Sequence, residues 1–91
     1  MQKITRNAEF IKYFKDGGRE QKNCNNLHII GDKLYNYGTI LIEDDGAIAK
    51  VNLTKYSRTT SKIQSYIKRE YADLNREVVY FDNIDFNSDD L

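Results

Sequence analysis

The feature that most constrains the fold is an apolar stripe with helical spacing in the second half of the chain. Its members recur every three or four residues, the period of one helix face: Ile63, Tyr66, Ile67, Tyr71 and Leu74. We therefore predict a helix over 61–75, with Ser61 and Gln64 at the spacing of a capping box. A helix of this kind is stable mainly through what its apolar face packs against. The rest of the chain must supply that surface.

Short apolar segments upstream predict a sheet. Segments 26–30, 33–42 and 47–53 are predicted as strands, separated by turn signals at Gly31-Asp32 and over 43–46. Strands joined by such tight turns form an antiparallel meander. Segment 77–82 is predicted as a fourth strand. Along 33–42, the strand period divides the side chains into one face with Tyr35, Tyr37 and Thr39 and another with Leu34, Ile40 and Ile42.

A short helix is predicted over 7–16, and a loop over 19–25. The helix has Asn7 as its cap, Glu9 in its first turn, an apolar stripe, and a Gly17-Gly18 stop; the stripe consists of Phe10, Ile11 and Phe14. The predicted fold is α+β: an antiparallel sheet of three to four strands packed against two helices, in the order α-β-β-β-α-β. We expect one domain over 1–83 and an acidic tail over 84–91.

Charge is balanced overall but uneven along the chain. The sequence has 14 basic and 14 acidic residues, so bulk attraction does not make it a polyanion binder. Segment 47–69 contains only basic charges, at Lys50, Lys55, Arg58, Lys62, Lys68 and Arg69. Acidic residues dominate the end, at Glu77, Asp82, Asp85, Asp89 and Asp90. The chain is therefore bipolar along its length.

Composition gives little support to catalysis, metal binding or membrane insertion. Cys24 and His28 are the single cysteine and histidine, which excludes an internal disulfide and a Cys-based zinc cluster. We interpret both as ordinary residues, and Asp44-Asp45-Gly46 as a turn rather than a calcium loop. No glycine pattern for binding phosphate opens a helix after a strand. With no signal sequence or membrane span, we expect a cytoplasmic protein that is not an enzyme and uses no cofactor.

A basic, hydroxyl-rich segment leads into the second predicted helix. Free N–H groups and the helix dipole favour an anion at such a start. The candidate contacts for a partner or a phosphate are Lys50, Lys55, Tyr56, Arg58, Thr59, Thr60, Ser61, Lys62 and Arg69. Alternatively, the hydroxyls only cap the helix and the basic residues form a solvated face. Similarly, Tyr35 and Tyr37 form either a stacking platform for bases or part of the core.

Two runs of residues carry a family resemblance. Leu34-Tyr35-x-Tyr37-Gly38-Thr39, followed by Asn52-x-x-Lys55-Tyr56-Ser57-x-Thr59-Thr60-Ser61-Lys62-x-Gln64, resembles a family of small uncharacterised proteins encoded by phages and mobile elements. The resemblance covers the middle third of the chain. A histidine often precedes the glutamine in that family, where this chain has Ile63, so no role of that histidine carries over. The resemblance implies a phage or prophage origin.

These observations favour binding as the function. We expect a phage-encoded accessory protein that docks on a host protein or ribonucleoprotein complex handling nucleic acid and inhibits it, as anti-CRISPR and other anti-defence proteins do. Either the basic face grips an acidic protein surface, or the acidic residues Asp82, Asp85, Asp89 and Asp90 occupy a basic groove. The alternative is a small DNA- or RNA-binding protein using segment 50–69. A homodimer through an exposed strand edge is a further possibility for its assembly.

Overall fold

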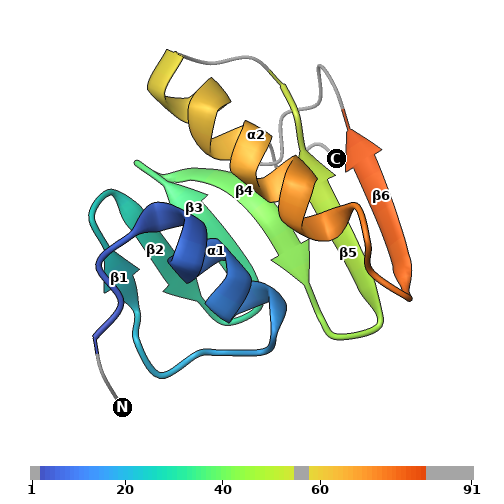
Figure 1. The fold of residues 1–91 in the computed structure, drawn as a ribbon, viewed down its shortest axis with the longest axis horizontal. Helices are drawn as coiled ribbons and strands as arrows, with labels where there is room; N and C mark the ends of the chain where they lie inside the picture. The colour runs from blue at the N-terminus through green and yellow to red at the C-terminus, as the bar shows by residue number, and fades with distance from the viewer. Residues whose placement is uncertain (1–2, 55–57, 82–91) are drawn as a thin grey trace.

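The computed structural model describes residues 3–54 and 58–81 of the chain. In that part the elements are α1 (Asn7–Lys15), β1 (Asn23–Cys24), β2 (Leu27–Ile30), β3 (Lys33–Asn36), β4 (Thr39–Asp44), β5 (Ile48–Asn52), α2 (Arg58–Tyr71) and β6 (Glu77–Phe81). Both helices lie on the same face of the sheet (Figure 1). The α+β class is therefore confirmed. Within these ranges no helix has the length and apolar character needed to cross a membrane.

The sheet is larger than predicted, and it is mixed. The described residues form a six-stranded sheet in which the strands lie in sequence order. Neighbours run antiparallel from β1 to β5, but β6 runs parallel to β5. The reason is α2, which crosses one face of the sheet and returns the chain to the end at which β5 begins (Figure 1). The prediction of an antiparallel sheet with three to four strands is therefore wrong in strand number and in its last pair.

The predicted strand over 33–42 is in fact a hairpin. The chain reverses between β3 and β4 at Tyr37 and Gly38, whose φ angles are +57° and +97°. Positive φ at both central residues is the geometry of a type I′ turn, whose twist matches the flanking strands. Gly38 inside an otherwise strand-like segment was the signal for the break. The prediction that Tyr35 and Tyr37 share a strand face is wrong, because Tyr37 lies at the turn.

A bulge in β4 alters which side chains enter the core. Leu34 pairs with Ile42 and Tyr35 pairs with Ile40, so Leu41 is an extra residue on this strand. A bulge disrupts the alternation of faces. Leu41 and Ile42 consequently both belong to the core cluster, whereas Ile40, which is also buried, lies outside that cluster. The predicted face of Leu34, Ile40 and Ile42 is thus corrected at Ile40.

The core lies between the helices and the sheet. The predicted helix stripes are confirmed: α1 buries Phe10, Ile11 and Phe14, and α2 buries Ile63, Ile67 and Tyr71. Tyr66 and Leu74 are partly buried against the same core, but α2 ends at Tyr71, so the predicted helix end at 75 is wrong and Leu74 packs from the chain beyond the helix. Because α2 begins at Arg58, Ser61 lies inside the helix, so the predicted capping box is wrong.

The ends of α1 agree with the prediction in part. Arg6, not Asn7, is the N-cap residue, and its side chain makes no capping hydrogen bond. The glycine stop is confirmed: Gly17 has φ +95°, and the Gly18 N–H donates to the Tyr13 carbonyl at 2.8 Å. The predicted loop over 19–25 contains β1, which is too short to show a periodic pattern.

A buried carboxylate joins the last turn of α2, the end of β4 and the chain before β6. Asp44 is 2% exposed, and Arg76 donates to its two oxygens at 2.6 and 2.7 Å. The Tyr71 hydroxyl donates to Asp44 at 3.1 Å, and the Gly46 N–H at 2.9 Å. Burial alone would raise the pKa of Asp44, but these hydrogen bonds and the Arg76 charge hold the pKa below its ordinary value. The predicted turn at Asp44-Asp45-Gly46 is confirmed.

Candidate binding groove

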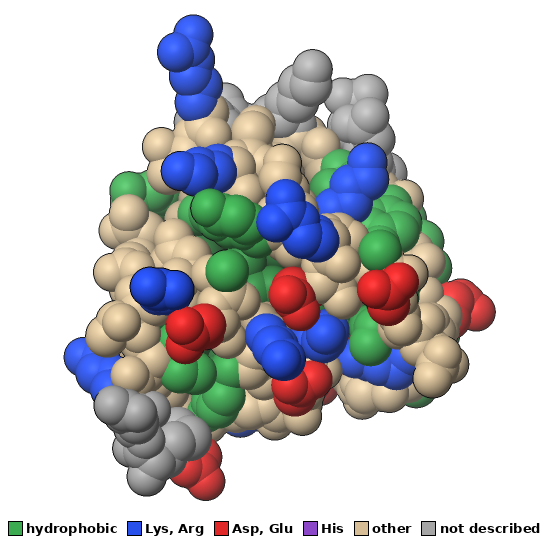
Figure 2. Space-filling view, in the orientation of Figure 1, with side chains coloured by type: hydrophobic (Ala, Val, Ile, Leu, Met, Phe, Trp, Pro, Cys, Tyr) green, Lys and Arg blue, Asp and Glu red, His purple; other side chains and the backbone are tan. Residues whose placement is uncertain are grey.

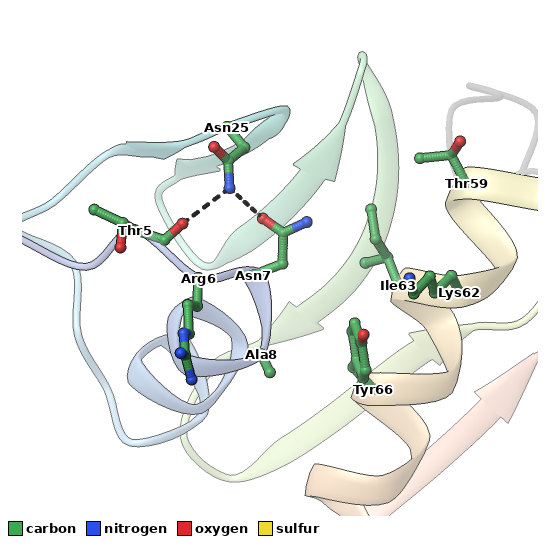
Figure 3. Close-up of a pocket in the computed structure, with 9 residues that line it drawn as sticks. All are labelled: Thr5, Arg6, Asn7, Ala8, Asn25, Thr59, Lys62, Ile63 and Tyr66. Carbon is green, nitrogen blue, oxygen red and sulfur yellow. Dashed lines mark hydrogen bonds between the residues drawn. The ribbon is translucent and has the colours of Figure 1, made fainter.

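A groove of about 620 Å³ separates the start of α1 from α2 on the helical side of the molecule. It is lined by Thr5, Arg6, Asn7, Ala8, Asn25, Thr59, Lys62, Ile63 and Tyr66. Figure 3 shows the two walls facing each other, with Arg6 and Ala8 on one side and Lys62 and Tyr66 on the other. We call this feature the α1–α2 groove.

The α1 wall is held in place by an asparagine in an uncommon backbone conformation. Asn25 has φ +55°, in the left-handed region that asparagine tolerates better than most residues. Its side-chain amide donates to the Thr5 carbonyl at 3.1 Å and to Asn7 Oδ1 at 2.9 Å (Figure 3). These bonds tie the β1–β2 turn to the start of α1. The first helical N–H bond is that of Phe10 to the Arg6 carbonyl, so the earlier N–H groups have no acceptor within α1.

The α2 wall follows directly from helical periodicity. Thr59, Lys62, Ile63 and Tyr66 have the spacing i, i+3, i+4 and i+7, which places them along one stripe of the helix. Ile63 is buried and Tyr66 is half-buried, so they form an apolar floor. Thr59 and Lys62 are exposed above it. The groove thus combines an apolar base with a hydroxyl and an ammonium group at its rim.

The electrostatic character of the groove is basic. Arg6 and Lys62 line it from opposite walls, and no carboxylate is among its described lining residues. Glu9 lies in the first turn of α1 but does not line the groove. In Figure 2 the upper half of this face carries Lys and Arg side chains without Asp or Glu among the coloured residues, whereas the lower half carries both charges. Such a surface favours a negatively charged ligand group.

The predicted contact residues are only partly brought together. Lys62 and Thr59 line the groove, and Arg58, Ser61 and Arg69 are exposed elsewhere on α2. Lys50 does not join them: its ammonium lies 3.9 Å from Glu43, and alternation along β5 places it on the face of the sheet away from the helices. Predicted residues outside the described ranges are Lys55, Tyr56, Asp82, Asp85, Asp89 and Asp90.

Thr60 is a correction to the predicted contact surface. It is buried, and its hydroxyl donates to Asn36 Oδ1 at 2.8 Å. The Asn36 amide in turn donates to the Asn26 carbonyl at 3.2 Å. A buried polar side chain needs such partners. Thr60 therefore fastens the first turn of α2 to the β3–β4 hairpin and is not available to a ligand.

Gln64 has the same structural role one helical turn later. Its buried side-chain amide donates to the carbonyls of Asn52 at 2.7 Å and Thr54 at 2.9 Å. We expect Gln64→Leu to cost about 1–3 kcal/mol, because these carbonyls would lose a hydrogen-bond donor. Chemical denaturation measures this loss. The exposed Ser65→Ala is the matched control, expected to change stability by less than about 0.5 kcal/mol. Equal stability of Gln64→Leu and the wild type would contradict this role.

Sequence reasoning named only Thr59 and Lys62 of the nine groove residues. It missed the whole opposite wall, which consists of Thr5, Arg6, Asn7, Ala8 and Asn25, and it did not predict Ile63 and Tyr66 as groove-lining side chains. Arg6 and Asn25 come from segments distant in sequence from α2, and no local pattern marks them. Tyr66 was predicted as a core residue, which describes only its inner side.

Catalytic groups do not converge in the described part of the chain. Cys24 is buried, and burial raises the pKa of its thiol, which disfavours the reactive thiolate. The His28 ring contacts Asn23 Oδ1 across the β1–β2 pair. No group of three His, Cys, Asp or Glu residues suited to a metal ion occurs within 3–54 and 58–81. Neither Cys24 nor His28 is among the described residues that line the groove.

The chain has no match among protein-family models, curated protein sequences or solved structures.

Proposed function

We propose that this is a non-enzymatic binding protein whose α1–α2 groove engages an anionic surface. In this proposal it is an accessory protein of phage or mobile-element type. It docks on a host complex that handles nucleic acid and inhibits that complex, in the manner of anti-CRISPR and other anti-defence proteins. The observation that carries the proposal is the lining of the groove, which has Arg6 and Lys62 on facing walls and no carboxylate among the described residues.

The physical argument starts from the two cations. Neither Arg6 nor Lys62 takes part in an ion pair within the described ranges, so both charges are open to a partner. The start of α1 adds N–H groups that have no acceptor within the helix. A phosphate or carboxylate entering the groove would meet these groups, and no carboxylate is among the described lining residues. Ile63 and Tyr66 would pack against an apolar part of the same partner.

Capture from host lysate tests this proposal. The wild-type chain should retain proteins that handle nucleic acid, and Arg6→Glu/Lys62→Glu should lose them. Lys12→Glu, which changes an exposed cation of α1 outside the groove, should retain them. Equal recovery of these proteins by the groove variant and the wild type would show that the groove is not the docking surface.

Direct binding of DNA or RNA is the second candidate function. It is favoured by the exposed cations on α2, Arg58, Lys62 and Arg69, which suit phosphates along a strand. With about two or three phosphate contacts, affinity for a single strand should fall about seven- to twentyfold between ~50 and ~200 mM NaCl. Anisotropy of fluorescein-labelled oligo(dT) measures this fall. No binding at the lower salt would remove this candidate and leave a protein partner.

A further inference from the structure

Tyr37 occupies a backbone position that does not suit it. It is the first central residue of the β3–β4 turn, with φ +57°, and Gly38 follows with φ +97°. Turns of this geometry favour asparagine, aspartate or glycine at both positions. A bulky residue in the left-handed region costs about 1–3 kcal/mol. The turn would therefore form more readily with Asn at position 37.

The Tyr37 side chain contributes little to the stability of the fold. The residue is 67% exposed and belongs neither to the core cluster nor to the residues packed against it. Its hydroxyl makes no hydrogen bond within the described ranges. The one hydrogen bond of the residue there runs from its backbone N–H to the Asn26 carbonyl at 3.4 Å, and any residue except proline can make it. The ring is thus held outward at a position where it weakens the turn.

The surroundings of Tyr37 indicate what the ring contacts. The hydrogen bond from Thr60 to Asn36 fixes this turn beside the first turn of α2, and the adjacent Thr59 lines the groove. In Figure 3 the tip of the hairpin rises at the same end of the groove as Thr59. The exposed isoleucines Ile30 and Ile48 lie at the other end of the sheet, near the β2–β3 and β4–β5 turns. The Tyr37 turn is therefore held near the Thr59 end of the groove, away from the exposed isoleucines.

We propose that Tyr37 stacks on an unpaired base of a single-stranded nucleic acid whose phosphates enter the α1–α2 groove. This inference rests on the nucleic-acid form of the proposed function. An aromatic ring beside cations is the usual arrangement for binding single strands, because every base has a face that can stack. A duplex hides those faces within its own stack, so the single strand is the favoured form. The groove by itself does not predict a preference for a single strand over a duplex; the stacking contact does.

Three variants test the stacking contact. Tyr37→Asn should weaken binding of fluorescein-labelled oligo(dT) by about tenfold, since one stacked base contributes about 1–3 kcal/mol. Its thermal midpoint should equal or exceed that of the wild type, because Asn suits the turn. Tyr37→Phe should bind within about twofold of the wild type, because the ring and not the hydroxyl stacks. Lys62→Gln should also weaken binding of oligo(dT). This variant tests the contribution of the groove independently of the stacking contact.

The outcomes separate this inference from the proposed function. Unchanged affinity in Tyr37→Asn together with weaker binding in Lys62→Gln would overturn the stacking contact and leave the groove standing. Tighter binding of a duplex than of the single strand would also overturn it. If the wild type binds no oligo(dT) at ~50 mM NaCl, the inference fails, whereas the lysate experiment still decides whether a protein docks in the groove.

Discussion

Asp44→Asn should lower the free energy of unfolding by about 3–5 kcal/mol, the usual cost of breaking a buried ion pair by removing one partner. The variant keeps the size of the side chain but removes the charge that pairs with Arg76 at 2.6 and 2.7 Å. It also turns an amide donor toward the guanidinium. For a domain of this size, a loss of about 3 kcal/mol should lower the thermal midpoint by about 12–24 °C. Thermal unfolding followed by circular dichroism measures this loss.

Two further variants keep the first prediction specific. Glu43→Gln removes a neighbouring carboxylate of β4 whose partner, Lys50, is 3.9 Å away and exposed, so it should cost less than about 1 kcal/mol. The double variant Asp44→Asn/Arg76→Met removes both charges. Its loss of stability should be smaller than the sum of the losses measured for Asp44→Asn and for Arg76→Met separately. Additive losses would show that the pair is not coupled.

Acid sensitivity follows from the same carboxylate. The folded-state pKa of Asp44 lies below the ordinary value of 3.8, so folding favours the ionised form. Its contribution to stability is therefore fully present above the unfolded-state pKa, and it is lost as the pH falls through the folded-state pKa. Wild type and Asp44→Asn should consequently converge in stability toward low pH. A stability difference that does not shrink between about pH 5 and pH 2 would contradict this assignment.

Arg6→Glu/Lys62→Glu should reduce affinity for the proposed anionic ligand by about a hundredfold. Each substitution replaces attraction by like-charge repulsion in the groove, and about 3 kcal/mol in total corresponds to that factor. Folding should be preserved, because both side chains are exposed. Glutamate at the start of α1 should even stabilise that helix by about 0.3–1 kcal/mol. Titration of labelled oligo(dT) or of a captured partner measures the affinity.

Lys12→Glu is the matched control for this charge reversal. Lys12 is an exposed cation of α1, but it lies outside the groove. Its reversal changes the net charge without changing the groove lining, so affinity should fall by less than about fivefold through the weaker general field. A loss as large as that of the groove variant would mean that bulk charge, not the groove, determines binding.

Local periodicity was sufficient to predict the helices but not the details of the sheet. The stripes led by Phe10 and Ile63 identify α1 and α2, because each recurs with the helical period. The predicted strand over 33–42 concealed a turn at Tyr37, because tyrosine is not a typical residue for the left-handed region. The parallel pairing of β6 depends on α2 crossing the sheet, which no strand pattern encodes. A two-residue strand such as β1 has no pattern at all.

The candidate site was predictable only on its α2 side. Lys62 and Thr59 were expected to face outward, and they do. Thr60 was expected beside them, but helical geometry turns it by about 100° from Thr59 and into the molecule. Arg6 and Asn25 reach the groove because tertiary packing places α1 against α2. Contacts between segments so distant in sequence depend on the packing of the whole domain, and a single sequence does not specify them locally.

An NMR titration of the backbone amides with oligo(dT) locates the contact surface residue by residue, and it therefore decides whether an anionic ligand enters the α1–α2 groove. We expect the largest shifts on the two walls of the groove, at residues 5–8 and 59–66, with Asn25 and the Tyr37 turn beside them. Shifts concentrated on the helix-free face of the sheet, around His28, Tyr35 and Lys50, would show instead that the groove is not the binding site.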